Sequence, residues 1–135
     1  MTDRPPVDAL HHITLSVRDL ATSAAWYQRL LGDAVTADRV GDGWTRLRLE
    51  WPSGIIIVLT RHESTAPDDS FDHTRVGLDH IALSCPDEAA VRGWAARMDA
   101  AGIEHGPVED VAYGWVLTAR DTDRIPLEFF CRKAA

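Results

Sequence analysis

An internal repeat dominates this sequence. Residues 10–29 align without a gap on residues 78–97, a shift of 68 positions that gives nine identities in twenty. Self-similarity of this kind indicates two copies of one structural module. The identical pairs are Leu10 and Leu78, His12 and His80, Ile13 and Ile81, Leu15 and Leu83, Ser16 and Ser84, Asp19 and Asp87, Ala21 and Ala89, Trp26 and Trp94, and Arg29 and Arg97.

Each copy opens with a strict alternation of apolar and polar or small residues, HHITLSV and DHIALSC. This alternation predicts a strand with one apolar face toward a core. The opposite face carries a histidine followed by small or hydroxyl residues, which suits the wall of a cavity. These residues are His12, Thr14 and Ser16 in the first copy and His80, Ala82 and Ser84 in the second.

An amphipathic helix follows each of these strands. Asp19 and Asp87 are placed to accept the free N–H groups of a helix start, apolar residues follow at helical spacing, and Gly32 and Gly102 end the helices. Segments separated by turn-forming residues and polar loops then predict three short strands in each copy. The predicted strands cover residues 35–40, 44–51, 55–61, 103–107, 113–119 and 125–131.

The element order is therefore βαβββ twice, an α+β class of fold. We expect a single domain over residues 1–135, with module one at about 8–62, a polar linker at about 63–76 and module two at about 77–133. Two cysteines, Cys85 and Cys131, lie in apolar stretches and are expected to be buried free thiols.

Charge and hydropathy exclude several classes of function. The 135 residues carry a formal net charge of −7, so the chain offers no general positive field for nucleic acid. An acidic substrate would need a local basic pocket. No apolar run is long enough for a membrane span, and MTDRPPVDAL lacks the order of a signal peptide. We expect a soluble, cytoplasmic protein that binds neither nucleic acid nor membranes.

Two histidines and one carboxylate are the candidate metal ligands. His12 and His80 occupy the same repeat position, so a fold that pairs the copies can bring their imidazoles together. Glu128 stands among apolar residues in IPLEFF, where a carboxylate is costly unless paired or metal-bound. Its repeat partner is Ile57 or Val58, and neither can ligate. Three protein ligands leave open positions, as in catalytic metal sites.

Further residues are candidates for catalysis or for substrate contact. Glu50, near the end of a predicted strand, is a possible general base if it faces inward, and a solvated glutamate otherwise. The hydroxyls on the cavity face can donate hydrogen bonds, the tryptophans can stack on a flat ligand, and His105 and Tyr113 can line a cavity mouth. The candidates for substrate contact are Thr14, Ser16, Trp44, Ser84, His105, Tyr113 and Trp115.

The chain resembles the vicinal oxygen chelate superfamily, which groups glyoxalase I, extradiol dioxygenases, methylmalonyl-CoA epimerase and the fosfomycin- and bleomycin-resistance proteins. HHITLSVRDLATSAAWYQRLLG, LDHIALSC and YGWVLTARDTDRIPLEFF carry the resemblance. It implies an eight-stranded, incompletely closed mixed sheet around a metal-binding cavity, commonly in a homodimer. His12, His80 and Glu128 match the metal-ligand positions, and a dimeric site can draw one ligand from the partner chain.

The sequence departs from the family pattern at two places. Family members commonly have Asp-Pro-x-Gly before the last strand, where this chain has Asp121 to Arg124. Arg124 brings a positive charge near the metal strand, which suits an anionic substrate or a salt bridge. Glyoxalase-type members add a fourth ligand, which is absent at Ile57 and Val58. The potassium-binding loop of fosfomycin enzymes has no match, and His105 and Tyr113 fit the dioxygenase pattern loosely.

Two functions follow from this reading. The first is a divalent-metal-dependent lyase, isomerase or ring-cleaving dioxygenase acting on a small oxygenated molecule that chelates the metal. Its ligands are His12, His80 and Glu128, and Glu128, Tyr113 or Glu50 take acid–base roles. Iron, manganese, nickel, cobalt and zinc suit this ligand set equally. The alternative is a sequestering protein of the bleomycin-resistance type that binds an aromatic metabolite or antibiotic without metal.

Overall fold

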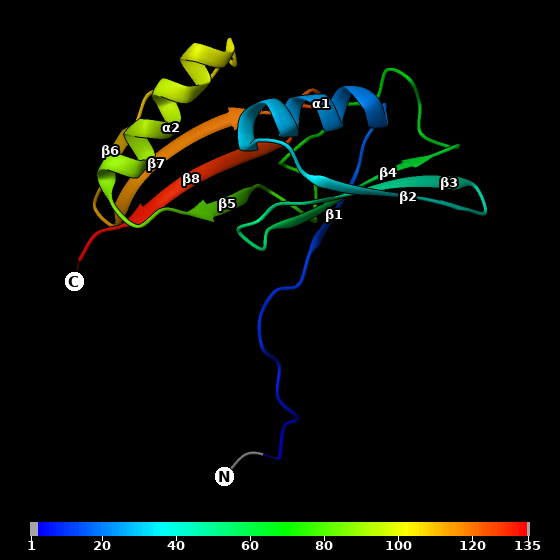
Figure 1. The fold of residues 1–135 in the computed structure, drawn as a ribbon, viewed down its shortest axis with the longest axis horizontal. Helices are drawn as coiled ribbons and strands as arrows, with labels where there is room; N and C mark the ends of the chain where they lie inside the picture. The colour runs from blue at the N-terminus through cyan, green and yellow to red at the C-terminus, as the bar shows by residue number, and fades with distance from the viewer. Residues whose placement is uncertain (1–2, 135) are drawn as a thin grey trace.

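Two copies of one βαβββ unit make up the computed structural model, which describes residues 3–134 (Figure 1). The predicted tandem arrangement is confirmed. The elements are β1 (Ile13–Ser16), α1 (Leu20–Leu31), β2 (Val35–Gly41), β3 (Trp44–Glu50), β4 (Ile56–His62), β5 (Ile81–Ser84), α2 (Glu88–Ala101), β6 (Glu109–Val111), β7 (Gly114–Arg120) and β8 (Pro126–Arg132).

The strands form two four-stranded mixed sheets with the same topology, β1-β4-β3-β2 and β5-β8-β7-β6. In each sheet the first strand of the module pairs in parallel with the last, and the other pairs are antiparallel. Neither sheet closes into a barrel. Between residues 3 and 134 the eight strands thus divide equally between the modules, and no ladder joins the two sheets.

The strand register settles which residue of the first module corresponds to Glu128. Thr14 on β1 lies opposite Val58 on β4, and Ala82 on β5 lies opposite Glu128 on β8. Since Thr14 and Ala82 occupy equivalent repeat positions, Val58 is the counterpart of Glu128. The two modules share a backbone plan, but only the second carries a carboxylate at this position.

Both helices begin and end where the sequence predicts. The side chains of Asp19 and Asp87 accept hydrogen bonds from the backbone N–H groups of Thr22 and Ala90, respectively, each at 2.8 Å. Gly32 and Gly102 are the C-caps, and Gly102 adopts the left-handed conformation that glycine tolerates best. The predicted helix boundaries are therefore confirmed at the level of the capping hydrogen bonds.

The core lies between the helices and one face of each sheet. It is built from Tyr27 and Leu30 of α1, Leu59 of β4, Met98 of α2 and Phe129 of β8, all of which are almost completely buried. The two cysteines are buried and free, as expected, and burial raises the pKa of the Cys85 thiol.

Both helices lie on the same side of the sheets, and the N-terminal segment projects from the other side (Figure 1). Each sheet therefore has one face packed on a helix and one face that no described helix covers. We call the latter the open face. His12, Thr14 and Ser16 share the parity of the open face, as the alternation predicts. Neither described helix has the length and apolar character to cross a membrane.

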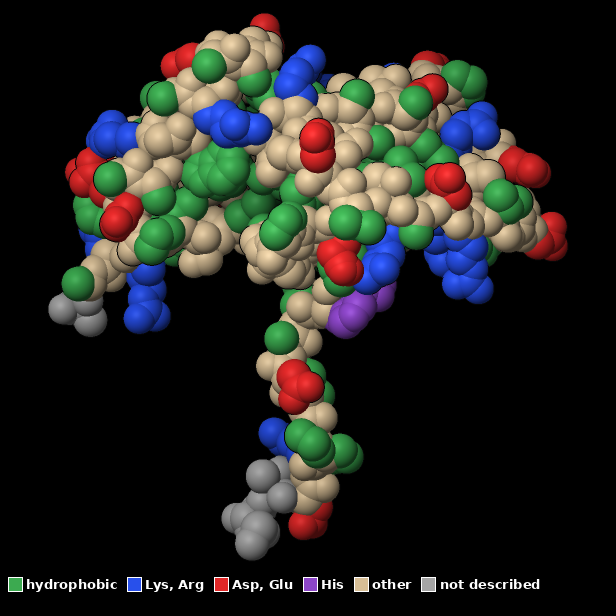
Figure 2. All heavy atoms as spheres, viewed as in Figure 1, with side chains coloured by type: hydrophobic (Ala, Val, Ile, Leu, Met, Phe, Trp, Pro, Cys, Tyr) green, Lys and Arg blue, Asp and Glu red, His purple; other side chains and the backbone are tan. Residues whose placement is uncertain are grey.

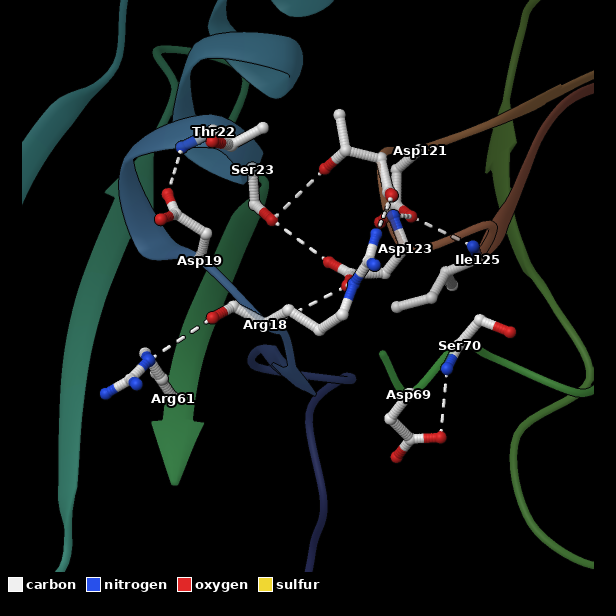
Figure 3. Close-up of polar contacts among 11 residues, drawn as sticks. Arg18, Asp19, Thr22, Ser23, Arg61, Asp69, Ser70, Asp121, Asp123 and Ile125 are labelled. Carbon is white, nitrogen blue, oxygen red and sulfur yellow. Dashed lines mark hydrogen bonds and ion pairs between the residues drawn. The ribbon is translucent and has the colours of Figure 1, made fainter. Parts of the chain in front are cut away.

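A buried polar network joins the modules (Figure 3). Arg18, just before α1, donates from its backbone N–H and its Nε to Asp123 in the turn between β7 and β8, and Ser23 Oγ donates to the same carboxylate. Tyr27 Oη donates to Asp121 Oδ2 at 2.7 Å. Asp121 and Asp123 are 5% exposed. This network fixes the start of α1 against the second module.

One predicted strand is misplaced. Residues 103–107 form only an isolated bridge, between His105 and Ala119, and the edge strand β6 begins at Glu109. Pro107 explains the difference, because proline has no N–H to donate to a strand ladder. His105 and Gly106 contact Ala119 and Thr118 of β7, and the regular ladder with β7 begins only at Glu109, after Pro107.

Candidate functional site

A histidine and a glutamate meet on the open face of the second sheet. His80 immediately precedes β5, and Glu128 lies on the neighbouring strand β8. His80 Nε2 and Glu128 Oε2 are 3.4 Å apart, and the Glu128 side chain is 20% exposed. His80 Nδ1 lies 2.7 Å from Asp79 Oδ1, and this hydrogen bond lowers the pKa of Asp79. We call Asp79, His80 and Glu128 the second-module cluster.

The chemistry of this cluster suits a cation. When His80 donates its Nδ1 proton to Asp79, its Nε2 presents a lone pair to the Glu128 carboxylate. Two such acceptors 3.4 Å apart repel each other unless a proton or a metal ion lies between them. Metal–ligand bonds of about 2.0–2.2 Å set neighbouring donor atoms about 3.0–3.5 Å apart. His80 and Glu128 thus fit adjacent ligands of one ion, and Asp79 fits the outer carboxylate that orients a ligating histidine.

His12 lies on the open face of the first sheet, away from the second-module cluster. Its Nδ1 is 2.8 Å from His11 Nδ1, and the two rings meet edge to face. It lines a cavity of about 330 Å³ together with Thr14, Arg46 and Arg48. Figure 2 shows histidine and basic side chains adjoining on the side of the molecule from which the N-terminal segment leaves.

A single chain brings together two of the three predicted ligands. Across residues 3–134, no group of three or more His, Cys, Asp or Glu side chains is gathered closely enough to hold a metal ion. His80 and Glu128 are adjacent, while His12 belongs to the other module.

The predicted acid–base residues have different environments. Glu50, at the end of β3, accepts a hydrogen bond of 2.8 Å from Arg48 and is thereby part of an ion pair. Tyr113 is 66% exposed and stacks on Phe130 with ring centroids 6.0 Å apart. Phe130 lies two residues after Glu128 on β8, so this aromatic pair flanks the second-module cluster.

The two predicted stacking tryptophans lie on opposite faces. Trp44 on β3 shares the open face with Arg46, whose guanidinium lies 4.2 Å from the centroid of the Trp44 ring. Trp115 on β7 packs against the hydrophobic core instead, with the Lys133 ammonium over its ring. Trp44 is thus available to a ligand on the open face, and Trp115 supports the core.

Three further predicted contact residues lie outside the second-module cluster. His105 is held by the Gly106 carbonyl and by Asp99 of α2, and these hydrogen bonds raise its pKa. Arg124 is exposed in the turn between β7 and β8, where its backbone N–H donates to the Asp121 carbonyl. Ser84, at the end of β5, is exposed beside a cavity that Trp94 also lines.

Sequence reasoning overlooked Asp79, Phe130 and the arginines of β3. Each left a signal in the sequence, since Asp79 precedes His80 directly and Phe130 keeps the alternation of Glu128. Arg46 and Arg48 alternate with Trp44 in the same way. The facing of these strands was the missing information, because alternation gives two faces without saying which one a helix covers.

The family model of the Glyoxalase/Bleomycin resistance protein/Dioxygenase superfamily matches residues 9–129. The chain belongs to this superfamily. None of the curated proteins matches the sequence. Superfamily membership agrees with the tandem βαβββ topology and with the resemblance found in the sequence.

Solved structures with this fold include a glyoxylase/bleomycin resistance protein/dioxygenase domain from Frankia sp. EAN1pec, 31% identical, with a TM-score of 0.85 and coverage of 96% of both chains. The fosfomycin resistance protein FosX from Listeria monocytogenes is 21% identical, with a TM-score of 0.68 and coverage of 95% of this chain and 94% of that chain. A mutant FosX complexed with Mn(II) and 1S,2S-dihydroxypropylphosphonic acid has a TM-score of 0.63 at 21% identity, covering 93% of this chain and 90% of that chain.

Proposed function

We propose that this superfamily member is a divalent-metal-dependent enzyme that acts on a small oxygenated molecule chelating the metal. The observation that carries the proposal is the 3.4 Å approach of His80 Nε2 to Glu128 Oε2, with Asp79 on the other ring nitrogen. Iron, manganese, nickel, cobalt and zinc are all compatible with such ligands. The reaction is of the lyase, isomerase or ring-cleaving dioxygenase type.

The third ligand in this proposal is His12 from a second copy of the chain. His12 lies on an open face that no described helix covers, and so does the second-module cluster. A homodimer that sets the first module of one chain against the second module of the other completes two equivalent sites by symmetry. We propose that the enzyme works as a cytoplasmic homodimer of this kind.

The side chains around the second-module cluster have distinct roles in this proposal. When bound, the metal ion supplies Lewis-acid stabilisation of negative charge on a substrate oxygen. Glu128 and Tyr113 are the candidates for moving a proton, since both lie on the open face. Glu50 is a less suitable candidate, because its carboxylate is already held in a hydrogen bond from Arg48. Thr14, Ser16 and Ser84 offer hydroxyl groups to the substrate.

Metal analysis tests the proposal directly. After reconstitution with each candidate metal and removal of excess, the wild-type protein should retain about one ion per chain, and Glu128→Ala should retain almost none. Glu63→Ala, which removes an exposed glutamate of the segment between the modules, is the matched control and should bind like wild type. Equal metal content in the Glu128→Ala and wild-type proteins would show the proposal to be wrong.

Aromatic rings on the open faces favour a second candidate function, metal-independent sequestration of an aromatic molecule. Trp44 lies on one open face, and the Tyr113–Phe130 stack lies on the other. In that case, titration of metal-free protein with bleomycin would quench the tryptophan fluorescence, and Trp44→Phe would reduce the quenching. Absence of quenching in metal-free protein that binds metal normally would favour the enzyme.

A further inference from the structure

Three arginines share the open face of the first sheet. Arg46 and Arg48 lie two residues apart on β3, and Arg39 on β2 is directly opposite Arg46. The register therefore places three guanidinium groups on neighbouring positions of one surface. We call Arg39, Arg46 and Arg48 the arginine triad.

Such an arrangement is unfavourable without an anion. Like charges directly opposite each other on paired strands destabilise a sheet. The whole chain, the triad included, has a formal net charge of −7, so the concentration of positive charge here is a local property and does not reflect a basic protein. The equivalent positions of the second sheet are Val116 for Arg46 and Thr118 for Arg48, so the repeat itself does not require these charges.

The triad is held in place by its neighbours. The Arg46 guanidinium stacks on Trp44, and its Nε donates to Thr60 Oγ1 at 3.1 Å. Arg39 lies 5.9 Å from the centroid of the same ring. Trp44 can lie across the sheet because its ring covers Gly41, where a Cβ would come within 2.0 Å of it. These contacts order the guanidinium groups before any ligand arrives, which lowers the entropic cost of binding.

Donor groups of the triad remain for a ligand. Arg46 uses only Nε in the hydrogen bond to Thr60, and Arg48 uses only Nη2 in its ion pair with Glu50. The cavity of about 330 Å³ beside them is lined by all three arginines, by the apolar Ala37 and Val58, and by His12. Asp38 is the one carboxylate in this lining, so cationic groups outnumber it.

From this geometry we propose that the arginine triad binds the anionic group of the substrate, a carboxylate or a phosphoryl group, and holds it beside His12. Arginine forms paired hydrogen bonds with either kind of anion, which gives orientation as well as affinity. The inference rests on the proposed function for the identity of the substrate, but the anion site itself does not depend on a metal. Arg124, which the sequence analysis suggested for an anion, lies in the turn next to the network of Asp121 and Asp123 and is not part of this site.

Calorimetric titration of metal-free protein tests the proposal with three probes. At least one of benzoate and inorganic phosphate should bind. Binding of benzoate alone indicates a carboxylate site, and binding of phosphate alone indicates a phosphoryl site. Benzamide, the neutral analogue of benzoate, should bind at least tenfold more weakly than benzoate. Binding should weaken as salt is raised, because the site is open to solvent.

Variants locate the binding. Arg39→Gln and Arg48→Gln remove exposed charges and should each weaken anion binding about tenfold, and Arg46→Lys keeps the charge but loses the stacked, forked geometry. Arg92→Gln on α2 is the matched control, because it removes one exposed arginine from a helix. The control should bind the anions like wild type. If Arg92→Gln loses as much anion affinity as the triad variants, the loss comes from overall charge and the proposal is overturned.

Two other outcomes decide between this inference and the proposed function. No binding of benzoate or phosphate, with Arg48→Gln shifting the protein toward monomer in sedimentation, would mean that the triad pairs with carboxylates of a second copy. That result would overturn the inference and leave metal binding untouched. The other outcome combines two results: the triad variants lose anion binding, and wild-type protein retains no metal after reconstitution. It would support the inference and refute the proposed function.

Discussion

Asp79 decides which nitrogen of His80 is free to bind a metal ion. Its carboxylate holds Nδ1, which leaves Nε2 facing Glu128. Replacement by asparagine keeps the size of the side chain but offers a weaker acceptor, and its amide can turn to donate instead. We expect Asp79→Asn to lower metal affinity by about 10- to 100-fold without abolishing binding. Competition with a chelator of known affinity measures the change.

A control separates this effect from a general loss of negative charge. Asp68→Asn changes an exposed aspartate in the segment between the modules and should leave metal affinity unchanged. If Asp79→Asn binds metal as tightly as wild type, the carboxylate does not orient the imidazole.

The buried pair of Tyr27 and Asp121 predicts a pH-dependent stability difference. Burial raises the pKa of Asp121 above 3.8, so its contribution to stability is complete below that pH and is lost as pH rises through the raised pKa. Burial also keeps Tyr27 protonated, and its hydroxyl donates to the Asp121 carboxylate. Without this donor, the carboxylate form becomes less stable and the pKa of Asp121 rises further.

Tyr27→Phe should therefore lower the free energy of unfolding by about 1–3 kcal/mol at pH 7 and by less near pH 4, where Asp121 is increasingly protonated. Urea unfolding at both pH values measures the difference. Tyr113→Phe removes an exposed hydroxyl and should leave stability unchanged at either pH. A penalty for Tyr27→Phe that is constant with pH would contradict the assigned role of Asp121.

A candidate site residue could be predicted from the sequence where the chemistry of that one position was enough to single it out. Glu128 was identifiable because a carboxylate in an apolar strand needs a partner, and the structure gives it His80. The arginine triad was not identifiable, because charged residues on a strand are normally solvated. Only the register of β2 on β3 shows that the three guanidinium groups share one face with His12.

At the scale of elements, the repeat and the capping residues predicted nearly all of the fold. Asp19 and Asp87 mark the helix starts because an aspartate side chain satisfies N–H groups that the helix leaves free. The failure at residues 103–107 is also local in origin. Pro107 has no N–H to donate to a strand ladder, and β6 forms after it.

The turn between β7 and β8 carries a backbone strain that can be relieved. Arg124 has a φ of 70°, a conformation that costs side chains other than glycine about 1 kcal/mol or more. The related family pattern has glycine at this place. Arg124→Gly should raise the free energy of unfolding by up to about 1 kcal/mol, and Arg124→Ala, which keeps a Cβ, should not. Chemical denaturation of the three proteins measures this, and equal stability of the two variants would contradict it.

For the whole molecule, the arrangement of the two modules decides what one chain can bind. The network of Arg18, Ser23 and Asp123 fixes the modules so that both helices lie on one side. His12 and Glu128 then lie on separate open faces. The repeat predicted that these residues are equivalent in their modules, but it contained no information on whether the same chain or another one brings them together.

Mixing two variants that each lack one metal ligand tests whether the site is shared between chains. In a mixed dimer of His12→Ala and Glu128→Ala chains, one site combines the intact His12 of one chain with His80 and Glu128 of the other. The second site lacks two ligands. With random reassociation, metal content should recover to about a quarter of wild type. A mixture of His80→Ala and Glu128→Ala should recover nothing, because both residues come from one module. If the first mixture also recovers nothing, His12 of the partner chain does not complete the site and the shared-site proposal is wrong.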